Sequence, residues 1–180
     1  MRKLNIYMSE QFGQIYDQYV GKIYRFIVLK VETQEVAEDL CSEVFLRVFG
    51  EFQKSSIENI QAFLYQVARY AIADYYREKA SMRIVSIEDT EELLEEGSLF
   101  EEAIVRSEIE EVRKALGRLR DEYQNLIIWR YLDELSTQEI AQITGKTEGN
   151  VRVGLHRALG ALKSQMPAPD VNVPSSSVRM

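Results

Sequence analysis

The sequence predicts an all-α protein, made of two small helical domains joined by an acidic linker. Apolar residues recur at intervals of three and four along most of the chain, the spacing of helices that bury one stripe. Alternating apolar runs joined by hairpin dipeptides, which would signal antiparallel strands, are not found in the sequence. The prolines all follow Met166, so the strongest helix breaker does not interrupt the residues before it.

Charge is distributed unevenly along the chain, and this distribution indicates where the domain boundaries lie. The net charge is −7, and residues 81–108 alone carry 9 acidic and 2 basic side chains. Residues 1–80 carry 11 acidic and 10 basic side chains, and residues 109–180 carry 9 and 10. Self-repulsion in the acidic run opposes compact packing, so we interpret 81–108 as a linker, with a solvated helical face as the alternative. The predicted units are a first domain at 1–80, a second domain at 109–165 and a disordered, Pro/Ser-rich tail at 166–180.

Composition removes several classes of function. The chain has one cysteine, Cys41, and one histidine, His156, which excludes an internal disulfide and a Cys/His zinc site within the chain. The sequence also offers no Gly-rich phosphate loop and no nucleophile paired with a base, so it predicts no catalysis, no metal and no cofactor. It contains no apolar run of about 20 residues and no signal peptide, so we expect a cytoplasmic protein without direct membrane insertion.

Two helices are expected in the first part of the first domain. Residues 10–28 form one, with Phe12, Ile15, Tyr16, Tyr19, Ile23, Phe26 and Ile27 facing inward. Thr33 is the predicted N-cap of the next helix, whose apolar stripe runs from Val36 to Phe52. The opposite face of this helix is charged and carries Glu38, Asp39, Glu43 and Arg47. From the residues alone, this face is either a solvated surface, as on most helices, or a binding surface.

Residues 59–79 are expected to form the third helix of the bundle, with a core stripe from Ile60 to Tyr75. Off that stripe lies a mixture of aromatic and basic side chains, namely Tyr65, Arg69, Tyr70, Tyr76 and Arg77. Aromatic rings stack on exposed bases and cations neutralise the phosphate backbone, so this mixture suits unpaired nucleic acid. Packing of the tyrosines between helices is the alternative.

Residues 135–158 carry the most specific local signal, which is that of a helix-turn-helix. Ser136 and Glu139 have the spacing of a capping box at the start of the first helix. Gly145 suits the left-handed position that ends this helix, and Thr147 can cap the next one. The second helix then presents side chains as a recognition helix would, with Asn150, Arg152, Val153, His156 and Arg157 exposed. Two packed helices that touch no DNA are the alternative.

Together, these segments resemble the sigma-70 family of bacterial transcription initiation factors, and specifically its small extracytoplasmic-function (ECF, group 4) type. The resemblance covers about residues 7–165. It rests on Ala37–Leu40 (AEDL) followed by Glu43–Val48, on Ala62–Arg69 with Asp74–Arg77, and on Leu135–Leu159. Several ordered motifs at family-like spacing are more specific than one helix-turn-helix.

The resemblance implies a function and a role for each surface. Members of the family are not enzymes; they bind core RNA polymerase, direct it to the −10 and −35 elements of promoters and promote DNA melting. The helix that carries AEDL docks on the β′ clamp coiled coil, which implies this contact for Glu38, Asp39, Glu43 and Arg47. The third helix captures the melted non-template strand of the −10 element, which implies contacts for Tyr65, Arg69, Tyr70, Tyr76 and Arg77. The helix-turn-helix reads the duplex −35 element and touches the β flap, which implies DNA contacts for Asn150, Arg152, Val153, His156 and Arg157.

Two positions depart from the family pattern, and two rival functions stay open. Many relatives have a polar residue where Val153 stands and a basic one where Gly154 stands, so the promoter sequence is left open. The family is often held inactive by an anti-sigma protein, so an anti-sigma partner is expected. The main alternative is a free-standing helix-turn-helix regulator that binds duplex DNA without polymerase. The second rival is a helical protein-interaction adaptor.

Overall fold

The computed structural model describes residues 2–83 and 113–165, and over these residues it contains helices and connecting turns and no strand. Most of the predicted acidic linker and all of the predicted tail lie outside the described residues. Three helices make the first domain: α1 (Arg2–Val28), α2 (Gln34–Phe52) and α3 (Ile60–Arg83). The second domain contains a helical segment at 113–117, α5 (Asp121–Ile127), the π-helical turn η1 (Ile128–Leu132), α6 (Thr137–Thr144) and α7 (Glu148–Gln165). The all-α prediction is confirmed.

The first domain buries the stripes that the sequence predicts. The buried side chains of α2 are Ala37, Leu40, Cys41, Val44, Phe45 and Val48. Thr33 caps this helix as predicted, because its side-chain oxygen accepts a hydrogen bond of 3.3 Å from the backbone N–H of Val36. The ring of Phe12 on α1 lies against Phe45, Phe49 and Phe52, at centroid distances of 6.4, 4.8 and 5.6 Å. Aromatic contacts of this kind fix α1 against α2.

Three details of the first domain differ from the predictions. α1 begins at Arg2 and not near residue 10, and α3 continues to Arg83, beyond the predicted domain end at residue 80. Tyr16, predicted to face inward, is 45% exposed, although its ring contacts Phe45 at 4.8 Å. The tyrosine hydroxyl is polar, so an amphipathic ring at the rim of the core fits this position.

The helix caps in the second domain confirm the predicted helix-turn-helix. Ser136 and Glu139 form a reciprocal capping box at the start of α6. Gly145 ends α6 with φ 67°, in the left-handed region that glycine adopts without cost. Thr147 caps α7, because its Oγ1 accepts a hydrogen bond of 3.3 Å from the N–H of Asn150. Each of these features depends on residues close in sequence, which is why the pattern predicted them.

α5 and η1 precede the helix-turn-helix and were not predicted in detail. The N–H of Asp133 donates to the carbonyl of Ile128 at 3.0 Å, a bond across five residues that closes the π-helical turn. Glu134 then adopts a positive φ of 58°. Asp133, which lies between the π-helical turn and this left-handed residue, is buried.

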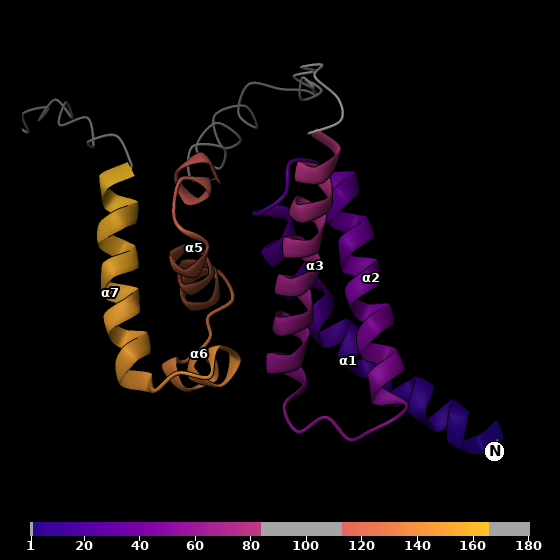
Figure 1. Ribbon diagram of the computed structural model, residues 1–180. Helices are drawn as coiled ribbons and strands as arrows, with labels where there is room; N and C mark the ends of the chain where they lie inside the picture. The colour runs from indigo at the N-terminus through magenta and orange to yellow at the C-terminus, as the bar shows by residue number, and fades with distance from the viewer. Residues whose placement is uncertain (1, 84–112, 166–180) are drawn as a thin grey trace, which may run out of the picture.

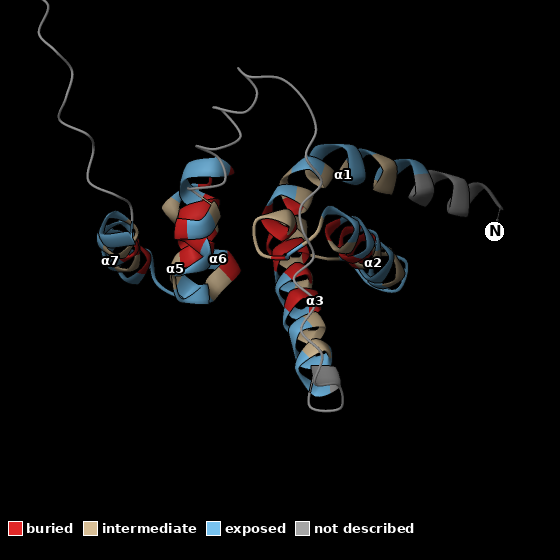
Figure 2. Cartoon of the chain, turned by 90° about the horizontal axis from the view of Figure 1, so that it is seen from above, coloured by how far each residue is buried: buried red, intermediate tan, exposed pale blue. Residues whose placement is uncertain are grey.

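The two domains pack against each other along α3. Figure 1 shows α3 with α1 and α2 on one side and the second domain on the other, and α6 contacts α3 directly. In the view from above, α7 lies on the outer side of the second domain, away from α3 (Figure 2). Buried side chains of both domains form one continuous apolar cluster. Within the described ranges, no helix is long and apolar enough to cross a membrane.

Candidate functional site

The charged face of α2 lies on the surface as expected. Glu38, Asp39 and Arg47 are exposed, and Glu43 is half-buried. Arg47 forms an ion pair with Glu43 one turn earlier on the helix. The apolar stripe of α2 packs on α1 and α3, so this opposite face is left open to a partner.

The structure places Tyr65 in the core, and the prediction that it lies off the core stripe is wrong. Its side chain is 0% exposed. Its ring lies 5.5 Å from that of Phe26 and 5.7 Å from that of Trp129, and its hydroxyl donates a hydrogen bond of 2.7 Å to Asp133 Oδ2. The helical pattern of α3 cannot show this burial, because part of the cover, Trp129 and Asp133, comes from the second domain. In this arrangement the Tyr65 side chain is not accessible from the surface.

Arg69 and Tyr76 lie on the same side of α3 as Tyr65, toward the second domain. The hydroxyl of Tyr76 donates a hydrogen bond of 2.6 Å to the backbone carbonyl of Lys30. Arg69 is exposed. The pKa of Asp121 in the second domain is lowered: burial opposes the shift, the charge of Lys30 lowers the pKa most, and the charge of Arg69 adds a smaller lowering. Both side chains therefore border the domain interface.

Tyr70 and Arg77 point toward α2 instead. Tyr70 is 66% exposed and lines a groove between α2 and α3 together with Leu46 and Arg47. Arg77 forms an ion pair of 2.9 Å with Asp74, whose other oxygen lies 3.9 Å from Arg47. The residues predicted to contact the −10 element thus occupy two sides of α3 and do not form one surface.

The predicted recognition residues of α7 do share one surface. All of them are exposed, and they follow one another at helical spacing as Asn150, Arg152, Val153, His156 and Arg157. The inward side of the same helix buries Val151, Leu155 and Ala158. Because the inward stripe fixes the rotation of α7, the exposed set is held in place as a unit.

Gly154 permits a close approach between α7 and α5. A Cβ atom at this position would lie 2.9 Å from Leu126 Cδ1, which is closer than side chains pack. A side chain at this position would therefore require Leu126 to shift. The sequence identified the departure, and the structure supplies its packing reason.

Several residues at the domain interface were not predicted as functional. Trp129 is 1% exposed and stacks on Phe26 at 5.8 Å, with an angle of 9° between the rings. Arg25 Nη1 lies 3.1 Å from Asp133 Oδ1, and burial raises the pKa of Asp133. The single tryptophan, Trp129, lies in the apolar run before Asp133, and this indicates a buried position. The residues around it in the sequence do not indicate which helix it contacts.

A second polar contact joins the domains near Lys30. Its ammonium group is buried, forms an ion pair with Asp121 and also donates to Asn125 Oδ1. Burial lowers the pKa of Lys30, and the ion pair with Asp121 opposes this effect. A metal site is not part of this arrangement, since residues 2–83 and 113–165 contain no group of three or more side chains suited to hold an ion.

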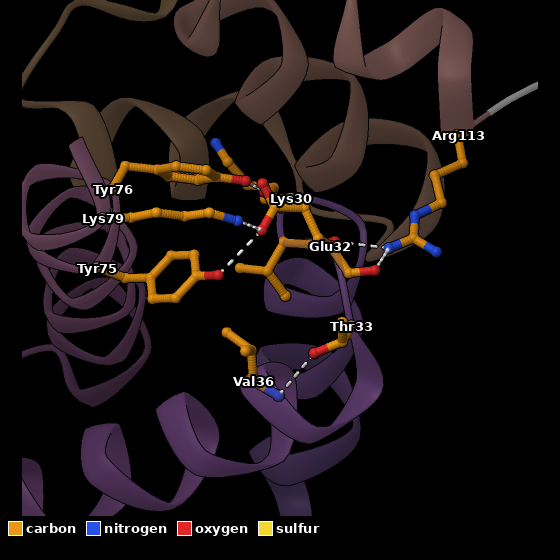
Figure 3. A network of polar contacts seen from close by, with 9 residues as sticks. Lys30, Glu32, Thr33, Val36, Tyr75, Tyr76, Lys79 and Arg113 are labelled. Atoms are coloured by element: carbon orange, nitrogen blue, oxygen red, sulfur yellow. Dashed lines mark hydrogen bonds and ion pairs between the residues drawn. The ribbon is translucent and has the colours of Figure 1, made fainter. Parts of the chain in front are cut away.

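Figure 3 shows how the loop between α1 and α2 connects α3 to the second domain. Glu32 accepts a hydrogen bond of 3.0 Å from the hydroxyl of Tyr75 and forms an ion pair with Lys79. Arg113, at the start of the described part of the second domain, donates to the backbone carbonyls of Val31 at 2.5 Å and of Glu32 at 3.4 Å. The loop is therefore held from both sides.

Comparison with known proteins identifies the family. The sequence model of Sigma-70 region 2 matches residues 15–82, and that of Sigma-70, region 4 matches residues 109–162. Among similar proteins is the ECF RNA polymerase sigma factor SigM of Bacillus subtilis, 33% identical over 156 residues, which are 84% of this chain and 92% of SigM. The ECF sigma factor SigW of the same organism is 28% identical over 168 residues, which are 88% of this chain and 90% of SigW.

Solved structures agree on the fold. The sigma factor RpoE of Bartonella quintana, in complex with the anti-sigma factor NepR, matches with a TM-score of 0.66 and 20% identity over 87% of this chain and 96% of RpoE. CnrH, in complex with the cytosolic domain of CnrY, matches with a TM-score of 0.65 and 16% identity over 87% of both chains. With both region models matched in order and a relative 33% identical over most of its length, this chain belongs to the sigma-70 family of RNA polymerase sigma factors, in its ECF group.

Proposed function

We propose that this protein binds core RNA polymerase and directs it to promoters with a −10 and a −35 element, where it promotes DNA melting. The observation that carries the proposal is that α2 and α7 expose two separate polar faces in the two regions that match the family models. One chain can then hold polymerase with its first domain and promoter DNA with its second. Catalysis is not part of this function.

The second domain suits duplex recognition. The N-terminal half of a recognition helix enters the major groove, where arginines bind guanine edges or phosphates. Arg152 and Arg157 are exposed on α7 and can serve in this way, with Asn150 and His156 as further polar contacts. Val153 is 50% exposed and would make an apolar contact, such as with a thymine methyl group.

The first domain suits polymerase binding and strand capture. Glu38, Asp39, Glu43 and Arg47 on α2 would contact the β′ clamp coiled coil, and the second domain would touch the β flap. For the unpaired −10 strand, the accessible candidates on α3 are Arg69, Tyr70, Tyr76 and Arg77. Exposed rings and cations together stabilise unpaired bases, which is the energetic requirement of melting.

Regulation by an anti-sigma protein is part of the proposal. RpoE and CnrH, which share the fold, were both solved bound to a partner, and the first of these partners is named an anti-sigma factor. A protein partner that covers the surfaces of α2 or α3 would block polymerase or DNA. We place the protein in the cytoplasm, where polymerase acts.

Co-elution with core RNA polymerase and run-off transcription from a fragmented genomic library test the function. We expect binding to core polymerase and discrete start sites, because two modest DNA-binding modules joined in one chain select sites with the correct spacing. Asp39→Ala with Glu43→Ala should weaken co-elution, whereas Arg152→Ala should leave co-elution intact and reduce transcription.

Two outcomes would contradict the proposal. Loss of core binding in Arg152→Ala would overturn the assignment of roles to the two domains. Specific binding of duplex DNA by the protein alone, without binding to core polymerase, would favour the free-standing regulator.

A further inference from the structure

We propose that Asp74 is a positioning residue, which restrains Arg77 in the free protein and connects the polymerase-binding face of α2 to the strand-binding side of α3. It acts as one member of a row of four alternating charges, formed by Glu43, Arg47, Asp74 and Arg77. The meaning of the two ends of this row rests on the proposed function. The row itself is defined by the contacts between its side chains.

The row crosses from α2 to α3, which lie side by side (Figure 1). Arg47 forms an ion pair with Glu43 on its own helix, and its Nη1 atom lies 3.9 Å from Asp74 Oδ2 on α3. The other carboxylate oxygen of Asp74, Oδ1, lies 2.9 Å from Arg77 Nη2. The two inner members of the row, Arg47 and Asp74, are therefore each shared between two partners of opposite charge.

Asp74 lies in the middle of the surface that Tyr70 and Arg77 present toward α2. Residues three and four apart on a helix share a side, so Asp74 lies one turn after Tyr70 and one turn before Arg77. Tyr70, Asp74 and Arg47 also line the same groove between α2 and α3. A phosphate that binds Arg77 would therefore meet the negative charge of Asp74 and would have to replace this carboxylate as the partner of the guanidinium.

The exposure of the row allows its ion pairs to exchange partners. The four side chains are between 40 and 73% exposed. Ion pairs between exposed side chains are weak, because water competes with them and because long side chains lose freedom when they pair. A new partner at one end of the row can therefore displace an existing one without disturbing the packing of the two helices.

The alternation of signs determines the direction of the coupling. A cationic group of a partner that binds Glu43 competes with Arg47 for this carboxylate. Arg47 then pairs more fully with Asp74, and Asp74 attracts Arg77 less strongly. Binding of polymerase at α2 would thus release a cation for the unpaired strand at α3, whereas in the free protein Arg77 is restrained and single strands bind less tightly.

Binding of a short fluorescein-labelled oligo(dT) strand by the full-length protein tests the role of Asp74, because this probe carries phosphates but no promoter sequence. Asp74→Asn keeps the shape of the side chain and removes its charge. We expect about two- to fivefold tighter binding, which corresponds to the loss of one exposed ion pair. The plot of log K against log salt concentration should also steepen by about 0.7, the value for one additional phosphate contact on a single strand. Fluorescence anisotropy at several salt concentrations measures both quantities.

Two double-mutant cycles decide whether the gain passes through the row. In an Arg77→Gln background, Asp74→Asn should give neither the gain nor the steeper salt dependence, because the restrained cation is absent. Glu43→Gln removes the competitor for Arg47 and should tighten oligo(dT) binding by about twofold. The same substitution should add little in the Asp74→Asn background.

Glu78→Gln is the matched control. Glu78 is an exposed residue on α3, next to Arg77 in the sequence, and it takes part in none of the ion pairs found within residues 2–83 and 113–165. Its substitution removes the same charge as Asp74→Asn, so a gain that comes from net charge alone would occur in both variants. We expect an unchanged salt dependence for Glu78→Gln. Circular dichroism checks that each variant is folded.

Three results would overturn the role of Asp74. The first is oligo(dT) binding by Asp74→Asn equal to that of the wild type, including no binding by either protein. The second is the same gain and the same steepening in Glu78→Gln. The third is a gain from Asp74→Asn that persists in the Arg77→Gln background.

The connection to α2 and the proposed function have separate tests. A full effect of Glu43→Gln in the Asp74→Asn background would overturn the connection to α2. Co-elution of the wild type with core polymerase is measured independently of oligo(dT) binding. Failure of that co-elution would overturn the proposed function, while the oligo(dT) cycles would still decide whether Asp74 restrains Arg77.

Discussion

At the scale of single residues, Gly154 and Gly160 are two glycines of one helix that have different surroundings. Gly154 faces α5, where an added Cβ would meet Leu126, and Gly160 has open space around its Cα. Both lie within α7, where glycine costs helix stability relative to alanine. Packing therefore explains the first glycine and leaves the second without a structural reason.

Alanine substitutions of these glycines should change stability in opposite directions. Gly160→Ala should raise the free energy of unfolding by about 0.5 to 1 kcal/mol, from helix propensity alone. Gly154→Ala has the same gain, but overpacking against Leu126 costs about 1 to 3 kcal/mol, so a net loss is expected. Urea unfolding followed by circular dichroism measures both, and stabilisation by Gly154→Ala would show that α5 yields without strain.

At the scale of elements, the helix-turn-helix depends on interactions within a few residues of each other. Glu139 accepts from both the N–H and the hydroxyl of Ser136, at 2.8 and 2.7 Å. These bonds, first that from the backbone, hold the pKa of Glu139 below its ordinary value of 4.5. The ionised form of the carboxylate thus stabilises the start of α6.

This pair predicts a specific acid dependence. Because the folded-state pKa of Glu139 is depressed, its contribution is present above pH about 4.5 and is lost as the pH falls through the lowered folded value. Glu139→Gln does not titrate, so its stability deficit relative to the wild type should shrink as the solution is acidified below that point. Thermal unfolding between neutral and acidic pH measures the difference, and a deficit independent of pH would contradict the prediction.

The elements also explain which parts were predictable. Thr33, Ser136 and Gly145 act on backbone within a few residues, so sequence spacing identified their roles. Tyr65 was assigned to the wrong side of α3, because its burial depends on Trp129, which is distant along the chain. The spacing of apolar residues shows which face of a helix is buried in its own domain, but it does not show that a second domain covers another face. All of the predicted tail, and the predicted linker apart from residues 81–83, lie outside the described residues.

For the whole molecule, the continuous core makes the stability of one domain depend on the other. Phe26 belongs to α1, yet it contacts Trp129 as closely as it contacts Tyr65 in its own domain. A substitution of Phe26 in the first domain should therefore also lower the stability of the second domain. The packing of aromatic side chains across the interface contributes to this coupling, together with the direct contact between α3 and α6.

Hydrogen exchange can measure this coupling in the full chain. Phe26→Ala removes a buried ring at a cost of about 3 to 5 kcal/mol, and we expect faster exchange of the α5 and η1 amides as part of that loss. Phe45→Ala is the matched control, because the Phe45 ring contacts Phe12 and Tyr16 within the first domain. Equal exchange rates in α5 for both variants would indicate that the interface does not couple the domains.

The π-helical turn η1 affects how this segment corresponds to those of other proteins. Its hydrogen bond from Asp133 to Ile128 encloses one residue more than the bond of an α-helix. A chain with one residue fewer between 128 and 132 would rotate the residues after the turn by about 100° and direct the carboxylate at the position of Asp133 away from α1. An insertion or deletion here, more than a substitution, would then decide whether a homologue inherits the buried carboxylate, and an alignment drawn without a gap would conceal the change.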